Sequence, residues 1–293
     1  MNKGKSVFQK ATIVLVIICG IMIFRNMSYP GEIQDPFTFI SIDCKTEEKL
    51  GINFPFDRSV YAEMINHLKN YQPKAIVLKF FFDLPKSKKG DQQLADSFKG
   101  IPVFLQATIN QENSPNAFLP RFNIFKNNSK NILTPFCVAK EKNGWIPLPI
   151  FQTNCYDIGF VDVYPTALSK VPLLTKYGDE YYKSLWFSIF TFIYPDAELV
   201  PGEYLNIKGK KISVTKYNEI SIILPGLSIT NNRIISAIDI MEDKTDKKLI
   251  KDKIVILIFS GKMFNEQYKS KGQMTPHEIF LLMLTGLYNK IGE

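Results

Sequence analysis

The feature that most constrains this chain is an uninterrupted apolar run near its amino terminus. Residues 11–24 carry no charged side chain; three lysines precede them and Arg25 follows. A helix of this length spans about 21 Å, which is short of a hydrocarbon core of about 30 Å. Because Lys10 and Arg25 can extend their charged ends to the two interfaces, a helix over residues 11–27 could still complete the crossing.

Two interpretations of this run remain open, an uncleaved anchor and a cleaved signal peptide. The residues just beyond it, Phe24 to Met27, match poorly the small side chains that a cleavage site requires, which favours the anchor. The excess of positive charge before the run places the amino terminus in the cytoplasm. We therefore expect a cytoplasmic tail at residues 1–10, a transmembrane signal anchor in contact with membrane lipid at residues 11–27, and an extracytoplasmic body that is periplasmic or extracellular.

Composition argues against several functional classes. The net charge is +8, but four positive charges lie at or before Arg25, ahead of the first acidic residue, Glu32. No segment gathers basic and aromatic residues as a nucleic-acid interface does, so we expect no nucleic-acid partner. Four cysteines without CxxC spacing and only two histidines make a metal site improbable. Phosphate-binding glycine motifs are absent from the sequence, and we expect no cofactor. The disulfide status of the cysteines outside the apolar run, Cys44, Cys137 and Cys155, stays open.

The first half of the body alternates strand and helix patterns, which is typical of a sheet with parallel strands covered by helices. Asp57 is a plausible cap for the first of these helices. The patterns predict strands at residues 37–43, 75–82 and 101–106, and helices at residues 58–70 and 91–98.

The second half is less regular. Residues 107–131, rich in Asn, Pro and Ser, indicate a long surface excursion. We expect strands at residues 131–138, 158–164 and 253–259, helices at residues 180–194 and 276–288, and a meander of short strands at residues 204–207, 211–214 and 220–224. The predicted fold class is α/β: a mixed, largely central β-sheet with helices on its faces and a small β-meander, preceded by one transmembrane helix. The domain itself is expected over residues 37–290.

The order of several segments resembles a known family. The segments ISID, NFPFDRSVYAEMINHL, PKAIVLKFFFD, DQQLADSF and IPVFLQ follow one another as in the opening of the second type of CHASE extracellular sensory domain. The resemblance continues through residues 159–161, 183–185, 235–239, 249–257 and 274–280, and covers residues 37–287. It implies a sensory module outside the membrane, usually followed by transmembrane helices and a cytoplasmic cyclase, kinase or diguanylate cyclase.

The chain departs from this family pattern in four places. It reaches Glu293 without such helices or an output domain, which argues against cyclase or kinase activity of its own. Lys79 stands where the second strand typically carries an acid. Residues 165–169 replace a turn of the type Asp-Gly-Val-Val-Arg, and Ile258 and Phe259 stand where a glycine is expected. The fold can survive these changes while a ligand site is lost.

Four residues are candidates for ligand binding: Asp43, Arg58, Asp83 and Asp91. They lie at predicted strand ends or helix starts, the edge of an α/β sheet where ligands commonly bind. Arg58 could pair with Asp43 or Asp83, or hold a carboxylate through two hydrogen bonds. Salt bridging and helix capping are the favoured alternative for all four.

No residue is predicted to be catalytic. His277 and Glu278 follow a proline and suit an ordinary helix start. Ser260-Gly261 lacks the spacing of a nucleophile elbow.

The sequence therefore predicts a non-enzymatic sensory or binding domain without its own output domain. It would bind an unknown small ligand or an envelope partner and act through another membrane protein, such as a receptor, or through self-association. The alternative is a structural or interaction protein of the cell envelope that retains the sensory fold without a ligand site.

Overall fold

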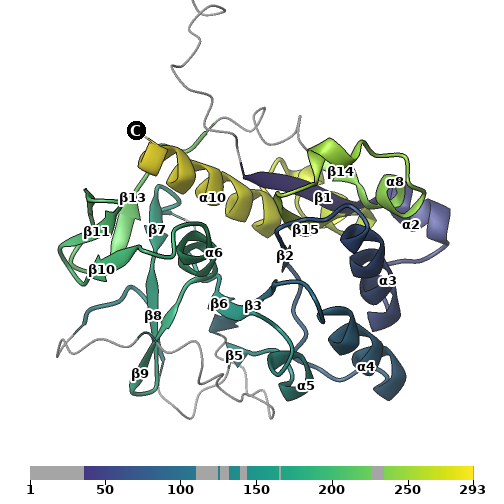
Figure 1. The fold of residues 1–293 in the computed structure, drawn as a ribbon, viewed down its shortest axis with the longest axis horizontal. Helices are drawn as coiled ribbons and strands as arrows, with labels where there is room; N and C mark the ends of the chain where they lie inside the picture. Colours follow the sequence, from purple (N-terminus) through teal and green to yellow (C-terminus); the bar gives the residue numbers. More distant parts are fainter. Residues whose placement is uncertain are drawn as a thin grey trace, which may run out of the picture. The chain divides into compact units, whose positions relative to one another are not determined.

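A largely parallel sheet forms the centre of the protein (Figure 1). The computed structural model describes residues 36–109, 125, 132–138, 144–164, 166–225 and 234–292. Six strands run parallel in the spatial order β14-β1-β15-β2-β3-β6, and β5 pairs antiparallel with β3. Their bounds are Ile234–Ser236 for β14, Phe37–Asp43 for β1, Ile254–Ser260 for β15, Ala75–Leu78 for β2, Val103–Ile109 for β3, Asp157–Phe160 for β6 and Gly144–Trp145 for β5. The predicted mixed α/β sheet is confirmed.

The longest strand pairing joins opposite ends of the body. Strands β1 and β15 pair in parallel register from Phe37↔Ile254 to Asp43↔Ser260. Both are rich in β-branched and aromatic residues, and both are buried on the two faces, as the interior strands of a parallel sheet must be. The first strand of the body therefore forms its backbone hydrogen bonds with one of the last.

Alternate side chains of these strands enter two separate cores. In β2, Ile76 and Leu78 join the core beneath α3 and α4, whereas Ala75 and Val77 join the core beneath α6 and α10. The first core also receives α2 and α8, so helices cover both faces of the sheet. The helices span Cys44–Leu50 (α2), Arg58–Lys69 (α3), Lys88–Ser97 (α4), Pro149–Gln152 (α5), Leu185–Ile193 (α6), Ala237–Met241 (α8), Lys262–Gln267 (α9) and Pro276–Gly292 (α10).

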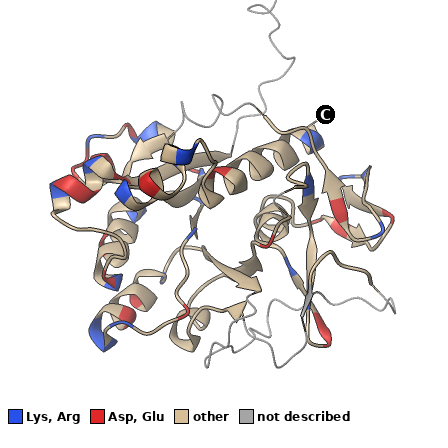
Figure 2. Ribbon diagram, turned by 180° about the vertical axis from the view of Figure 1, so that it is seen from behind, with Lys and Arg blue, Asp and Glu red and all other residues tan. Residues whose placement is uncertain are grey.

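Side-chain caps fix where the longer helices begin. The Asp57 carboxylate accepts a hydrogen bond from the Ser59 backbone N–H at 2.9 Å, which confirms the predicted cap of α3. Ser87 caps α4 through the Gly90 N–H at 3.1 Å, so this helix starts three residues before the predicted Asp91. Charged side chains fall mainly on helices and turns, while the central strands carry few (Figure 2).

The predicted helix at residues 180–194 is wrong over its first part. Residues Glu180–Lys183 form strand β9, which pairs antiparallel with β8 (Leu174–Tyr177). Gly178 has a φ of 63°, a left-handed conformation that glycine adopts without strain and that allows the tight turn between the strands. Helix α6 begins only after Ser184, which caps it through the Phe187 N–H at 3.2 Å.

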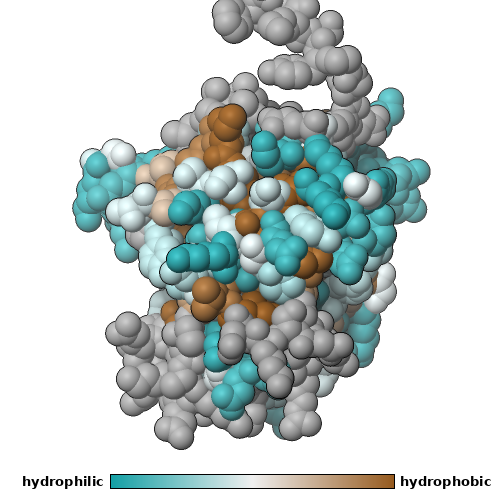
Figure 3. Space-filling model, turned by 90° about the vertical axis from the view of Figure 1, so that its left-hand side faces the viewer, coloured by the Kyte–Doolittle hydropathy of each residue, from teal (hydrophilic) through white to brown (hydrophobic). Residues whose placement is uncertain are grey.

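The predicted meander is correct for two strands and wrong for the third. Strand β11 (Tyr204–Ile207) pairs with β12 (Lys210–Ser213) and with β10 (Glu198–Val200). Strand β13 (Glu219–Ser221) leaves this small sheet and pairs with β7 (Lys170–Pro172). Figure 3 looks onto the side of the molecule at the left of Figure 1, where hydrophilic side chains cover most of the described surface and hydrophobic ones form separated patches.

Several predicted boundaries move. Strand β2 ends at Leu78, four residues before the predicted end, and β3 continues to Ile109. Of the strand predicted at residues 131–138, only Cys137–Val138 (β4) is a strand in the described part. The remainder of the predicted excursion at residues 110–131, apart from residue 125, lies outside the described residues, as do residues 1–10 and the predicted anchor at residues 11–27. Within the described ranges, no helix is both long and apolar enough to cross a membrane.

Candidate functional site

A cavity opens where strands β15, β2, β3 and β6 end. Since these strands are parallel, their carboxyl ends meet at one edge of the sheet, the place where open α/β sheets commonly bind ligands. The cavity has a volume of about 580 Å³, which lies within the range of small-molecule sites. Aromatic side chains dominate its lining, among them Phe54, Phe80, Trp145, Trp186, Phe259 and Phe280.

Lys79 is the cationic side chain of this cavity. It follows β2 directly, and the alternation of the strand turns it to the same face as Val77. Its Nζ donates a hydrogen bond to Gln106 Oε1 at 2.5 Å and lies 4.2 Å from the centre of the Phe280 ring. Burial lowers the pKa of Lys79 to about 7, an effect that the negative charge of Asp162 opposes.

His277 lies in the first turn of α10 and also faces the cavity. Its Nδ1 accepts a hydrogen bond from the Phe259 backbone N–H at 2.8 Å, which joins the helix start to the end of β15. Burial first, and then the charge of Lys79, lowers the pKa of His277 to about 3. His277 is therefore a neutral, structurally engaged imidazole at physiological pH, which does not suit it to act as a general base there.

The neighbouring Glu278 closes the helix start. Its carboxylate accepts from the Thr275 N–H at 2.9 Å, while the Glu278 N–H donates to Thr275 Oγ1 at 3.1 Å. This reciprocal arrangement is a capping box. The predicted structural role of these residues accounts for their contacts.

Asp162 adds a negative charge near Lys79. Its carboxylate accepts hydrogen bonds from Thr108 Oγ1 at 2.6 Å and from the Ile109 backbone N–H at 3.0 Å. Burial raises the pKa of Asp162 to about 6, against the effect of these hydrogen bonds and of Lys79. Asp162 is thus held at the end of β3 and shares the electrostatic environment of the cavity.

Three of the four sequence-predicted site residues come together elsewhere, at the start of α3. Arg58 is buried; its Nε lies 3.5 Å from Asp91 Oδ1, and its guanidinium lies 4.6 Å from the Phe82 ring centre. It also donates a hydrogen bond to the Leu84 carbonyl oxygen at 3.0 Å. Burial raises the pKa of the nearby Asp83, and the charge of Arg58 opposes this rise. These contacts tie the segment after β2 to α3 and α4.

Asp43 belongs to a different network. Its Oδ1 accepts from the Thr46 N–H at 2.9 Å, from Thr46 Oγ1 at 2.7 Å and from Ser236 Oγ at 2.9 Å. It caps α2 and ties β1 to the start of α8. The four predicted residues therefore do not form one constellation, and a ligand role for any of them stays a prediction.

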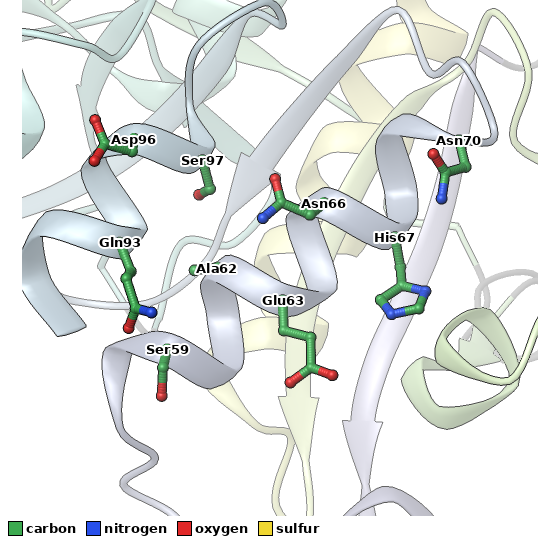
Figure 4. A pocket seen from close by; sticks show the side chains of 9 residues that line it. All are labelled: Ser59, Ala62, Glu63, Asn66, His67, Asn70, Gln93, Asp96 and Ser97. Carbon is green, nitrogen blue, oxygen red and sulfur yellow. The ribbon is translucent and has the colours of Figure 1, made fainter. Parts of the chain in front are cut away.

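A second hollow lies between α3 and α4 (Figure 4). Its side chains come from both helices and are largely polar, including Glu63, His67 and Asp96. Asp96 is already engaged by Gln92 and Lys99. The hollow is more open to solvent than the cavity at the strand ends and lacks its apolar lining, so we place the candidate site at that cavity.

Sequence reasoning missed Gln106 as a site residue and considered Lys79 only as a departure from a family pattern. Strand alternation was the available signal, because Lys79 and Gln106 both continue the face of Val77 and Phe104. The aromatic walls from α6 and α10 had no local signal, since they reach the cavity from distant parts of the chain.

In the described part of the chain, no group of three His, Cys, Asp or Glu side chains is arranged to hold a metal ion. Cys44 and Cys155 carry free thiols, and burial followed by the charge of Asp157 raises the pKa of Cys155 to about 12.

Comparison with protein families gives one match. The family model described as the CHASE2 domain matches residues 22–279, which is most of the chain. Searches among curated proteins and among solved structures found no significant match.

Proposed function

The chain belongs to the CHASE2 domain family, and from this premise we propose that it senses a small molecule through the cavity at the carboxyl ends of β15, β2, β3 and β6. Domains of this family are sensory, extracytoplasmic and without catalytic activity of their own. We further propose that residues 11–27 anchor the chain in the membrane, that the body lies outside, and that binding is passed to a membrane partner or a second copy.

One observation carries the ligand-binding part of the proposal: a buried lysine at a partly enclosed aromatic cavity. A cation removed from water is unfavourable unless its contacts offset the desolvation, and the lowered pKa of Lys79 is consistent with contacts that offset it only in part. A purely structural core would be more stable with an apolar residue there. Groups kept at such a cost commonly serve binding or function.

The position of the cavity would also allow ligand binding to affect the conformation of the rest of the domain. Its walls include Phe259 at the end of β15 and His277 at the start of α10. These two elements belong to the central sheet and to the helix layer that covers it. A ligand that favours one arrangement of these walls would shift the population of the whole domain.

A screen of the full chain in lipid nanodiscs tests the ligand-binding part. The chain contains two tryptophans, and both Trp145 and Trp186 line the cavity. A compound that binds there should change their fluorescence and raise the unfolding temperature. At a concentration one hundred times its Kd, it should raise the free energy of unfolding by about 2.7 kcal/mol. A broad metabolite screen without any such compound would favour the alternative of a structural envelope protein.

Membrane topology needs a separate test. An epitope tag placed behind Glu293 should be reached by an impermeant antibody in intact cells, and a tag placed before Met1 should be reached only after permeabilisation. The reverse pattern would exclude an extracytoplasmic body. The ligand screen is independent of this result.

A further inference from the structure

We propose that the cavity binds an organic monoanion, with its carboxylate paired to Lys79 Nζ and its apolar body lying among the aromatic rings. This inference rests on the proposed function, because it names the ligand class of the same cavity. Three features of the cavity support it: the unfilled hydrogen-bonding capacity of Lys79, the balance of charge, and the apolar volume.

Protein side chains of the described residues supply one acceptor for the ammonium group of Lys79. A lysine ammonium has three donors, and among the described residues one of them is accepted, by Gln106 Oε1 at 2.5 Å. The Phe280 ring face, 4.2 Å away, offers attraction but no strong acceptor. A carboxylate at Nζ would supply charged acceptors, and such hydrogen bonds are about twice as strong as neutral ones. Gln106 carries an amide NH₂ beside the same position, a second donor group for the anion.

The balance of charge favours one negative charge rather than two. Lys79 is the single Lys or Arg among the described residues that line the cavity. His277 does not add a positive charge near neutral pH, because its pKa is lowered to about 3. Asp162 accepts hydrogen bonds from Thr108 and Ile109, and among the ion pairs of the described residues none joins it to Lys79. A dianion such as a phosphate monoester would bring a second charge that no cation of this lining meets.

The rest of the cavity suits an apolar body. Aromatic rings from several separate segments line the cavity together with the lysine, including those of Phe54, Trp145 and Trp186. A volume of about 580 Å³ exceeds the needs of an acid as small as acetate and admits a phenyl or branched alkyl group. Burial of such a group would supply the apolar part of the affinity at about 25 cal/mol per Å².

Matched probes test the assignment: 4-phenylbutanoate and its neutral amide, 4-phenylbutanamide. They differ in charge but hardly in shape. Binding to the full chain in nanodiscs is followed through the fluorescence of Trp145 and Trp186. We expect the carboxylate to bind at least about tenfold more tightly than the amide, equivalent to about 1.4 kcal/mol.

Two variants separate Lys79 from general charge effects. Lys79→Met should remove the preference for the carboxylate and retain binding of the amide, since it deletes the charge and keeps the length of the side chain. Lys211→Met is the matched control, because Lys211 is exposed and lies at the same 4.2 Å from an aromatic ring, that of Tyr204. Its preference should equal that of the wild type.

Equal affinity of the two probes for the wild type, or a carboxylate preference that survives in Lys79→Met, would overturn the inference. Failure of both probes to bind counts against it as well. The broad screen then separates the proposed sensing function from the assignment of an anionic ligand. A neutral or cationic compound bound in the cavity would support the sensing function and refute the anionic ligand. The absence of any bound compound would refute both.

Discussion

At the scale of single residues, we expect the replacement of Lys79 to have a large effect on the free energy of unfolding. Lys79→Met should raise the free energy of unfolding by about 1 to 4 kcal/mol at neutral pH, because it removes a buried cation whose contacts offset its desolvation only in part. Equilibrium denaturation of the ligand-free protein measures this. A variant less stable than the wild type at neutral pH would show that Gln106 and Phe280 stabilise the charge fully.

The pH dependence of this difference follows from linkage. The pKa of Lys79 is lowered from 10.5 to about 7 on folding, so between these values the unfolded chain binds more protons than the folded one. Wild-type stability from this group therefore rises with pH across that window, by at most about 1.4 kcal/mol per pH unit. The advantage of Lys79→Met should be largest below about pH 7 and shrink toward pH 10.5.

Asp157 makes a second prediction at this scale. The buried carboxylate accepts hydrogen bonds from Lys183 Nζ at 2.6 Å and from Ser188 Oγ at 2.7 Å, and so joins β6 to β9 and α6. Asp157→Ala should lower the free energy of unfolding by about 2 to 3 kcal/mol, because both donors lose a charged acceptor. Thermal or urea unfolding measures the loss, with the exposed Asp196→Ala as a control expected within about 0.5 kcal/mol of the wild type. An equal effect of the two variants would contradict this account.

At the scale of elements, the contact between β6 and α6 depends on Gly159. A Cβ at this position would lie 2.3 Å from Leu185 Cα and 2.4 Å from Leu185 N, both backbone atoms that cannot turn away. Gly159→Ala should therefore separate the helix from the strand and cost about 3 kcal/mol, measured by urea denaturation.

Gly90→Ala provides the comparison for this prediction. Its new methyl group would lie 2.7 Å from Ser87 Oγ and 2.8 Å from Asp57 Oδ1, which are the ends of two capping side chains and not backbone atoms, and 3.4 Å from Arg58 Cβ. We expect a smaller cost than at Gly159, of about 1 kcal/mol, because these side chains can shift but weaken their caps when they do. A cost at Gly90 as large as that at Gly159 would mean that backbone proximity does not set the penalty.

The elements also show how far sequence patterns reach. Local sequence patterns located β1, α3, β15 and α10, because α3 buries a repeating apolar face and the other three carry continuous apolar runs. The helix predicted from Glu180 was wrong because hairpin pairing with β8 overrides local preference, and the segment carries no strong strand pattern of its own. The partner of β13 was missed for the same reason: strand neighbours are a property of the tertiary fold.

The candidate site was predictable only in part. The edge of the sheet that would hold it followed from the parallel strand order. Arg58 was expected to pair with Asp43 or Asp83, but its ion pair is with Asp91, and Arg58, Asp83 and Asp91 lie away from the cavity lining. The cavity depends on α6 and α10 meeting the strand ends, which no local pattern encodes.

At the scale of the whole molecule, the sheet cannot be completed until late in the chain. A chain that ends at Lys253 lacks β15, which lies between β1 and β2. We expect this truncation to lose compact structure and to be cut rapidly in limited proteolysis, because both neighbours would lose a full row of backbone hydrogen bonds. A chain that ends at Ile291 keeps every strand and should resist proteolysis like the wild type. Equal resistance of both truncations would refute the central role of β15.

The in-register pairing of β1 and β15 also has a mechanical consequence. Tension applied along β1 would load its seven rungs with β15 together, in shear, instead of peeling them apart one after another. The neighbouring ladder with β14 shares that load over Phe39 to Ser41. Phe259 belongs to β15 and lines the cavity. A force on β1 that displaces β15 would therefore also move the cavity wall where the ligand is proposed to bind.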